Sequence, residues 1–112
     1  MNRHIQKTIY VNENGKRKRI ECDMRVVLLV KSLWKAGFKT EYSCEGNVAD
    51  RRVTDFPYIT LKECENPDVA EVIIKDYWKC PVMKSKFRNG YAFYALTSKR
   101  TVKMWEKHHG DF

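Results

Sequence analysis

The sequence predicts a single α+β domain spanning residues 1–112, an antiparallel sheet with helices on one face. A chain of 112 residues has the length of one domain, and a hydrophobic content of 43% is enough for a packed core. The hydrophobic residues alternate in some runs and follow the helical period in others. Two Asn-Gly pairs, Asn14-Gly15 and Asn89-Gly90, stand between strand-like runs and predict hairpins.

The first third of the chain predicts a hairpin followed by the central core helix. Residues 8–11 and 16–22 flank Asn14-Gly15 as two strands. Asp23 is suited to cap the next helix, and Gly37 is suited to end it in the left-handed conformation. Between them an apolar stripe recurs at helical spacing: Val26, Val27, Leu29, Val30, Leu33 and Trp34.

The middle of the chain predicts two strands and a second helix. Residues 38–43 and 58–61 read as strands, separated by a polar, irregular stretch. Asn66-Pro67-Asp68 supplies a cap, a proline at the first helical position and an early acid, so a helix begins there. This helix ends near Cys80-Pro81.

The last third predicts a second hairpin and a terminal helix. Residues 82–88 and 91–97 flank Asn89-Gly90, and a helix capped by Ser98 runs to Gly110. The order is therefore ββαββαββα. Omitting the first strand and the last strand with its helix leaves βαββαβ, so a ferredoxin-like core is one arrangement that this order allows.

Charge is distributed unevenly along the chain. Residues 1–22 have a net charge of +4, residues 23–78 of −2 and residues 79–112 of +6, giving +8 in total. This asymmetry favours an anionic partner, a nucleotide or a nucleic acid, and a surface tuned for solubility is the alternative. No apolar run approaches the roughly 18 residues of a membrane span, so we expect a cytoplasmic protein with no membrane partner.

The last hairpin is the first candidate ligand surface. If Asn89-Gly90 forms the turn, one face of the hairpin interleaves cations with aromatic rings: Lys84, Lys86, Arg88, Tyr91 and Phe93. The opposite face, which includes Met83, Phe87, Tyr94 and Leu96, is more apolar and is expected to face the core. Cations beside aromatic rings suit phosphates and stacked bases. The alternative is that the last helix covers Phe93 and the cations only line its edge.

The second candidate is a polar turn after the strand at 38–43. A turn of this kind can present backbone N–H groups to an anion, and two arginines follow it that suit a phosphate. The residues of this candidate pocket are Ser43, Cys44, Glu45, Gly46, Asn47, Arg51 and Arg52. An ordinary surface loop is the alternative.

The cysteines and histidines predict neither catalysis nor a metal site. Cys44 has no histidine near it in the sequence to act as a base, so no catalytic residue is assigned. The four cysteines contain no CxxC pair, so we expect free thiols and no metal ion. No phosphate-loop, dinucleotide or zincin motif occurs, and no cofactor is expected.

Gly37-Phe38-Lys39-Thr40 followed by Ser43-Cys44-Glu45-Gly46 resembles a motif of small uncharacterised proteins of bacteriophages and Gram-positive bacteria. The resemblance covers residues 33–47 and 58–61. Asn47 stands where those proteins usually have histidine, so a catalytic or metal-binding role of that histidine would not carry over. A looser likeness, confined to residues 40–46, is to the Thr-Ser-Ser-Cys-Ser-Gly-Arg segment of wybutosine-synthesising tRNA methyltransferases.

The phage-like resemblance implies an accessory role, such as sequestering a nucleotide signal of the host's defences. Together with the charge, it leads us to expect a non-enzymatic protein that binds a phosphate-bearing ligand, a nucleotide or a nucleic acid. One alternative is an inhibitor that docks on a host protein through Trp105, Tyr91 and Phe93. The other is a methyltransferase-like RNA-modifying enzyme that uses Cys44 or Glu45. A homo-oligomer is compatible with each of them.

Overall fold

The computed structural model describes residues 5–44 and 57–109. Its elements are, in chain order, β1 (Gln6–Glu13), β2 (Lys16–Asp23), a short 3-10 helix η1 (Met24–Val26), α1 (Val27–Lys35), β3 (Lys39–Cys44), β4 (Tyr58–Lys62), α2 (Asp68–Trp78), β5 (Val82–Phe87), β6 (Gly90–Ala95) and α3 (Lys99–His109). The predicted α+β class and the order ββαββαββα are confirmed.

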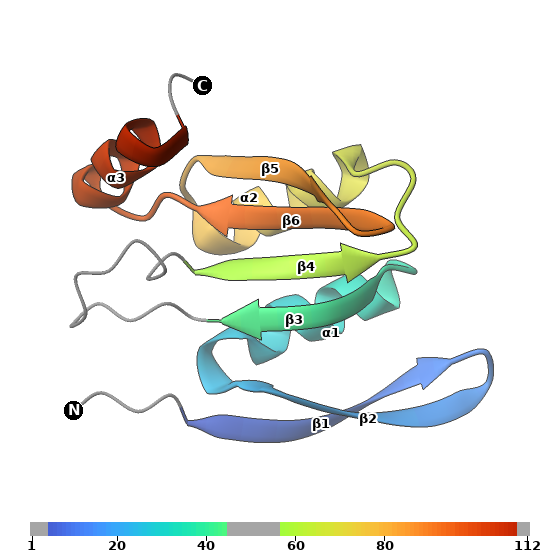
Figure 1. Ribbon diagram of the computed structural model, residues 1–112. Helices are drawn as coiled ribbons and strands as arrows, with labels where there is room; N and C mark the ends of the chain where they lie inside the picture. The colour runs from blue at the N-terminus through green and yellow to red at the C-terminus, as the bar shows by residue number, and fades with distance from the viewer. Residues whose placement is uncertain (1–4, 45–56, 110–112) are drawn as a thin grey trace.

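The strands form two antiparallel sheets, a two-stranded sheet of β1 and β2 and a four-stranded sheet in the order β3-β4-β6-β5. In Figure 1, α1 and α2 both lie behind the four-stranded sheet, and α3 lies beyond the end of β6. A ferredoxin-like core would place β2 inside this sheet. Here β2 pairs with β1, and β6 fills the position between β4 and β5, so the strand order differs from the ferredoxin-like one.

The local signals of the first hairpin and the helix ends are largely confirmed. Glu13 pairs with Lys16, and both turn residues between them have positive φ. Gly37, at φ 96°, ends the first helix as predicted. Asp23 stands before the short 3-10 helix η1 and makes no side-chain capping bond to it, and its carboxylate accepts a hydrogen bond from the Gln6 amide.

Asn66 and Ser98 bond to backbone N–H groups at the helix starts as predicted, although Pro67 is the N-cap residue of α2 rather than its first helical residue. The Asn66 side-chain oxygen accepts a hydrogen bond from the Asp68 N–H at 3.1 Å, at the start of α2. The Thr101 N–H donates to the Ser98 hydroxyl oxygen at 3.2 Å, at the start of α3. These bonds satisfy backbone N–H groups that would otherwise lack a partner in the first turn.

The turn of the second hairpin lies one residue earlier than predicted. Phe87 pairs with Gly90, so Arg88 and Asn89 form the turn, and Arg88 has a φ of 54°. Gly90 is instead the first residue of β6. A Cβ there would lie 1.7 Å from the carbonyl oxygen of Leu61 in β4. The glycine is therefore needed for close approach of two strands rather than for the turn.

The main core lies between the four-stranded sheet and the two helices behind it. Leu29 and Leu33 of α1 and Ile74 of α2 are fully buried there, against Ile59 and Phe93 of the sheet. A second, smaller cluster lies where α3 docks: Leu96 and Trp105 are buried with Met83, Tyr94 and Val102 packed around them.

Candidate nucleic-acid interface

The predicted cation-and-aromatic face of the last hairpin points in the opposite direction from the one expected. Lys86 pairs with Tyr91 and Lys84 with Phe93, so these residues share a face as predicted. Phe93 has no exposed surface and belongs to the main core, and Tyr91 packs against that core. This face therefore meets α1 and α2, and the prediction that it is a free ligand surface is wrong.

The two lysines of that face lie at its edge. β5 is an edge strand, so its long side chains reach past the sheet. The Lys84 ammonium lies 3.6 Å from Asp68 and 3.5 Å from Glu71, both on α2. The Lys86 ammonium lies 4.7 Å from the centre of the Tyr91 ring. The alternative prediction, in which a helix covers Phe93 and the cations line its edge, is closer to the structure. The helices that cover Phe93 are α1 and α2, however, and not the last helix.

The opposite side of the four-stranded sheet, here called the open face, faces the viewer in Figure 1. Because side chains alternate along a strand, it consists of the neighbours of the core residues. They include Glu41, Tyr42, Tyr58, Thr60, Lys62, Met83, Ser85, Phe87, Ala92 and Tyr94. Thr60 and Ala92, in the two central strands, form a buried floor between larger side chains.

A β-bulge sets the position of Tyr42 on this face. Thr40 pairs with Leu61 and Ser43 with Ile59, so two residues of β3 oppose one of β4. The extra residue turns both Glu41 and Tyr42 toward the open face. The Tyr42 N–H donates to the Thr60 hydroxyl at 2.8 Å, which fixes the bulge, and Tyr42 is 47% exposed.

Tyr42, Phe87 and Arg88 form a cluster that we call the aromatic bridge. The ring centres of Tyr42 and Phe87 are 6.5 Å apart although they start from the two edge strands, about 14 Å apart at the usual strand spacing. The rings therefore lean toward each other over the small residues of the central strands. The Arg88 guanidinium lies 5.6 Å from the Tyr42 ring and 5.2 Å from the Phe87 ring.

Arg88 remains accessible in this position. Its side chain is 60% exposed, and its nearest carboxylate is Glu41 at 3.5 Å. An exposed ion pair of this kind is weak and is screened by salt. A phosphate can therefore compete with Glu41 for the guanidinium, while the two rings hold the arginine in place.

Cations of α3 lie beyond the other end of the open face. Tyr94 has its ring 6.2 Å from that of Tyr58 and 5.2 Å from that of Trp105, so an aromatic row leads to α3. A surface hollow of about 400 Å³ on this helix is lined by Lys99, Arg100, Lys103 and Lys107. No ion pair joins any of these four cations to a carboxylate among the described residues. We call this feature the α3 hollow.

The candidate turn pocket lies mostly outside the described residues. Ser43 is half-buried in β3 opposite Ile59, and Cys44 ends that strand, with its side chain outside the described part. Glu45, Gly46, Asn47, Arg51 and Arg52 lie outside it entirely. The prediction of a phosphate pocket at this turn therefore stays a prediction.

The described thiols are free, as predicted, and none is activated. Cys22, Cys64 and Cys80 form no disulfide. Burial raises the thiol pKa of all three above its ordinary value, so each stays protonated at neutral pH. In residues 5–44 and 57–109, no cluster of three or more His, Cys, Asp or Glu side chains could hold a metal ion.

Comparison with protein-family models, curated proteins and solved structures found no match to this chain. The phage-like and methyltransferase-like resemblances therefore stay expectations. None of the described helices is long and apolar enough to cross a membrane.

Two features of the open face were missed by reasoning from the sequence. Tyr42 was not singled out, because only the bulge turns it to this side. The cations of α3 were counted in the charge of the last third but were not placed in one hollow. By contrast, Phe93 and Trp105 are both buried, so they are not available as anchors for a protein partner.

Proposed function

We propose that the protein binds single-stranded nucleic acid along the open face, with bases at the aromatic bridge and phosphates at the α3 hollow. The observation that carries this proposal is the exposed Arg88 guanidinium over the rings of Tyr42 and Phe87. Aromatic rings and arginine planes both accept stacked bases of any sequence.

The distance between the aromatic bridge and the α3 hollow favours a single-stranded nucleic acid over a single nucleotide as the ligand. The aromatic bridge lies at the start of β6 and the α3 hollow lies after its end. Five residue steps from Gly90 to Ala95 cover about 17 Å at the usual rise of a strand. An extended ligand reaches both features, and its backbone charge matches the cations of α3.

The test is a titration of labelled single-stranded RNA and DNA followed by fluorescence anisotropy at two salt concentrations. Tyr42→Ala and Arg88→Ala should each weaken binding about 5- to 150-fold, because one stacked base contributes about 1–3 kcal/mol. Lys103→Gln with Lys107→Gln should reduce the slope of log K against log salt by about 1.4, since each phosphate contact to a single strand contributes about 0.7.

Lys75→Gln is the matched control, because it removes an exposed lysine from α2 on the other side of the sheet. The affinity of this variant for single-stranded nucleic acid, and the slope of log K against log salt, should equal those of the unmodified protein. Binding that is unchanged in both Tyr42→Ala and Arg88→Ala would contradict the proposal. So would tight binding of a free mononucleotide at the aromatic bridge in preference to any strand.

The biological role proposed with this binding is an accessory, non-enzymatic one. It depends on the resemblance of residues 37–46 to the motif of small phage proteins. If the titration showed a preference for a mononucleotide, it would support one form of this role, the sequestering of a nucleotide signal of the host's defences.

A further inference from the structure

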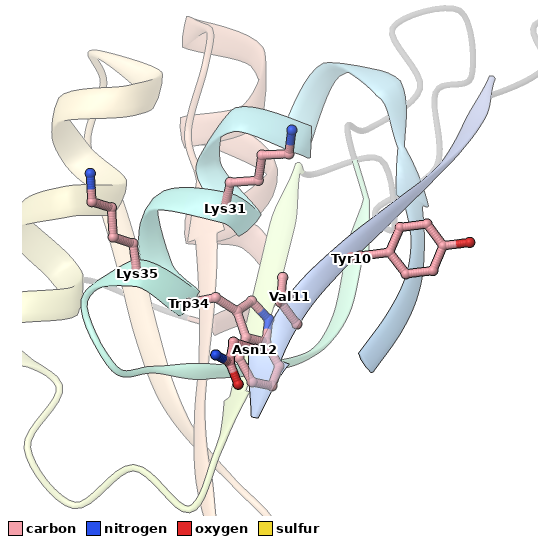
Figure 2. Close-up of a pocket in the computed structure, with 6 residues that line it drawn as sticks. All are labelled: Tyr10, Val11, Asn12, Lys31, Trp34 and Lys35. Carbon is pink, nitrogen blue, oxygen red and sulfur yellow. The ribbon is translucent and has the colours of Figure 1, made fainter. Parts of the chain in front are cut away.

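A second concave site lies between the first hairpin and α1, away from the open face. Tyr10, Val11 and Asn12 of β1 and Lys31, Trp34 and Lys35 of α1 line a pocket of about 270 Å³. Figure 2 shows the Trp34 ring beside Val11 and Asn12, with both lysines extending from the helix and Tyr10 turned away. We propose that this pocket binds a nucleoside monophosphate, with the base against Trp34 and the phosphate between Lys31 and Lys35.

Trp34 is held in place as a flat apolar surface. It is half-buried, and its indole N–H donates to the Thr40 hydroxyl of β3 at 2.8 Å. The only polar group of the side chain is thus satisfied inside the protein. Part of the ring packs against the main core, and the Lys18 ammonium lies 5.6 Å from the ring centre, so a base would pack on the part of the ring that faces the pocket. A ring fixed in this way loses little conformational freedom when a base packs against it.

Lys31 and Lys35 are one helical turn apart, so their side chains emerge as neighbours on the same side of α1. The helix contains no acidic residue. Among the described residues, neither lysine has an ion pair. The nearby carboxylate of Glu13 already lies 3.5 Å from Lys18 and 3.7 Å from Lys39. The two ammonium groups therefore leave a local positive charge that a phosphate dianion neutralises.

Asn12 and the size of the pocket narrow the ligand class. The Asn12 side chain is exposed beside Trp34, and an amide both donates and accepts hydrogen bonds, as the edge of a base requires. Ligand pockets usually have a volume of about 300 Å³ or more. This pocket is slightly smaller, so it suits one nucleotide, partly left in solvent, rather than a dinucleotide.

The test is an NMR titration of the full-length protein with adenosine monophosphate, adenosine and inorganic phosphate, each added separately. The indole N–H signal of Trp34, assigned with Trp34→Phe, and the amide signals of residues 10–12 should shift with the monophosphate. Adenosine and inorganic phosphate should each bind at least 10-fold more weakly, because each lacks one of the two recognised groups.

The double variant Lys31→Gln with Lys35→Gln should weaken monophosphate binding about 10- to 100-fold. Lys75→Gln, the matched control on α2, should leave it unchanged. Glutamine keeps a good helix propensity, so both variants should remain folded, which far-ultraviolet circular dichroism checks.

Three outcomes would overturn the proposal: shifts that map to Tyr42 and Arg88 instead, equal binding of inorganic phosphate, or equal binding of adenosine. The proposal does not rest on nucleic-acid binding at the open face. Lys31→Gln with Lys35→Gln should leave the binding of single-stranded nucleic acid intact, and Tyr42→Ala should leave the binding of the monophosphate intact. Failure of one site is therefore distinguishable from failure of the other.

Discussion

Replacing Gly90 with alanine should destabilise the protein by about 3 kcal/mol or more. A Cβ at this position would lie 1.7 Å from the carbonyl oxygen of Leu61 and 2.7 Å from its carbonyl carbon. Both are backbone atoms of β4, so no rotation of a side chain relieves the overlap. The central strands β4 and β6 must move apart instead.

The size of this effect follows from two contributions. Overpacking in a well-packed interior usually costs about 1–3 kcal/mol, even where side chains can adjust. Separating β4 from β6 also strains ladder hydrogen bonds, each with a net contribution of about 1 kcal/mol. For a domain of this size, a loss of about 3 kcal/mol lowers Tm by roughly 12–24 °C.

Urea unfolding, followed by circular dichroism at 25 °C, measures the effect, with Asn89→Ala as the control. Asn89 is an exposed turn residue, and its replacement should change the free energy of unfolding by no more than about 0.5 kcal/mol. If Gly90→Ala were neutral or stabilising and Asn89→Ala were the more harmful change, the turn would be Asn89-Gly90 and the register of this hairpin would be refuted.

Three further predictions concern the two faces of the sheet, its edge and the thiols. Phe93→Ala should lower the free energy of unfolding by about 3–5 kcal/mol and Phe87→Ala by clearly less, measured by urea unfolding, and the reverse ranking would restore the sequence-based assignment of the faces. Lys84→Met should change stability by less than about 1 kcal/mol but promote self-association in light scattering, because β5 loses a charge that protects its edge; an unchanged mass at high concentration would contradict this. The folded pKa of the Cys22 and Cys64 thiols is raised, so their contribution to stability is complete below the unfolded pKa, near 9.0, and falls as pH rises above it. Unfolding titrations at pH 7 and pH 10 should therefore show a lower free energy of unfolding at pH 10, and Cys22→Ala should make this difference smaller. A difference of equal size in that variant would count against the thiols as its cause.

Local signals in the sequence were sufficient for the class and for most element ends. Each of these signals meets a requirement of the nearby backbone, either a positive φ or a side-chain partner for a free N–H group. The residues are Asn14-Gly15, Gly37, Asn66 and Ser98. Short-range chemistry of this kind does not depend on what the element later packs against.

The direction of the last hairpin could not be obtained in the same way. Counting apolar residues selected the face of Met83 and Phe87 as the inner one. Lys84 is nevertheless on the inner face, because at an edge strand its ammonium reaches the carboxylates of α2. Whether a strand is central or at an edge depends on the strand order, which local patterns do not contain.

The candidate site was limited by the same kind of information. Arg88 was selected, although for the wrong face, and Tyr42 was missed. The bulge that exposes Tyr42 depends on the pairing of β3 with β4, and Gly90 was assigned to the turn although it serves a contact with β4. Both are relations between strands that are distant in the sequence.

The position of β6 has a consequence for how the chain acquires its structure during synthesis. β4 and β5 do not pair with each other, because β6, which follows both of them in the sequence, lies between them. It also brings Phe93, one of the largest fully buried side chains. A ribosome-bound chain that ends before residue 90 thus lacks the strand that joins the two halves of the sheet. Folding of this sheet must therefore wait until β6, residues 90–95, has been synthesised.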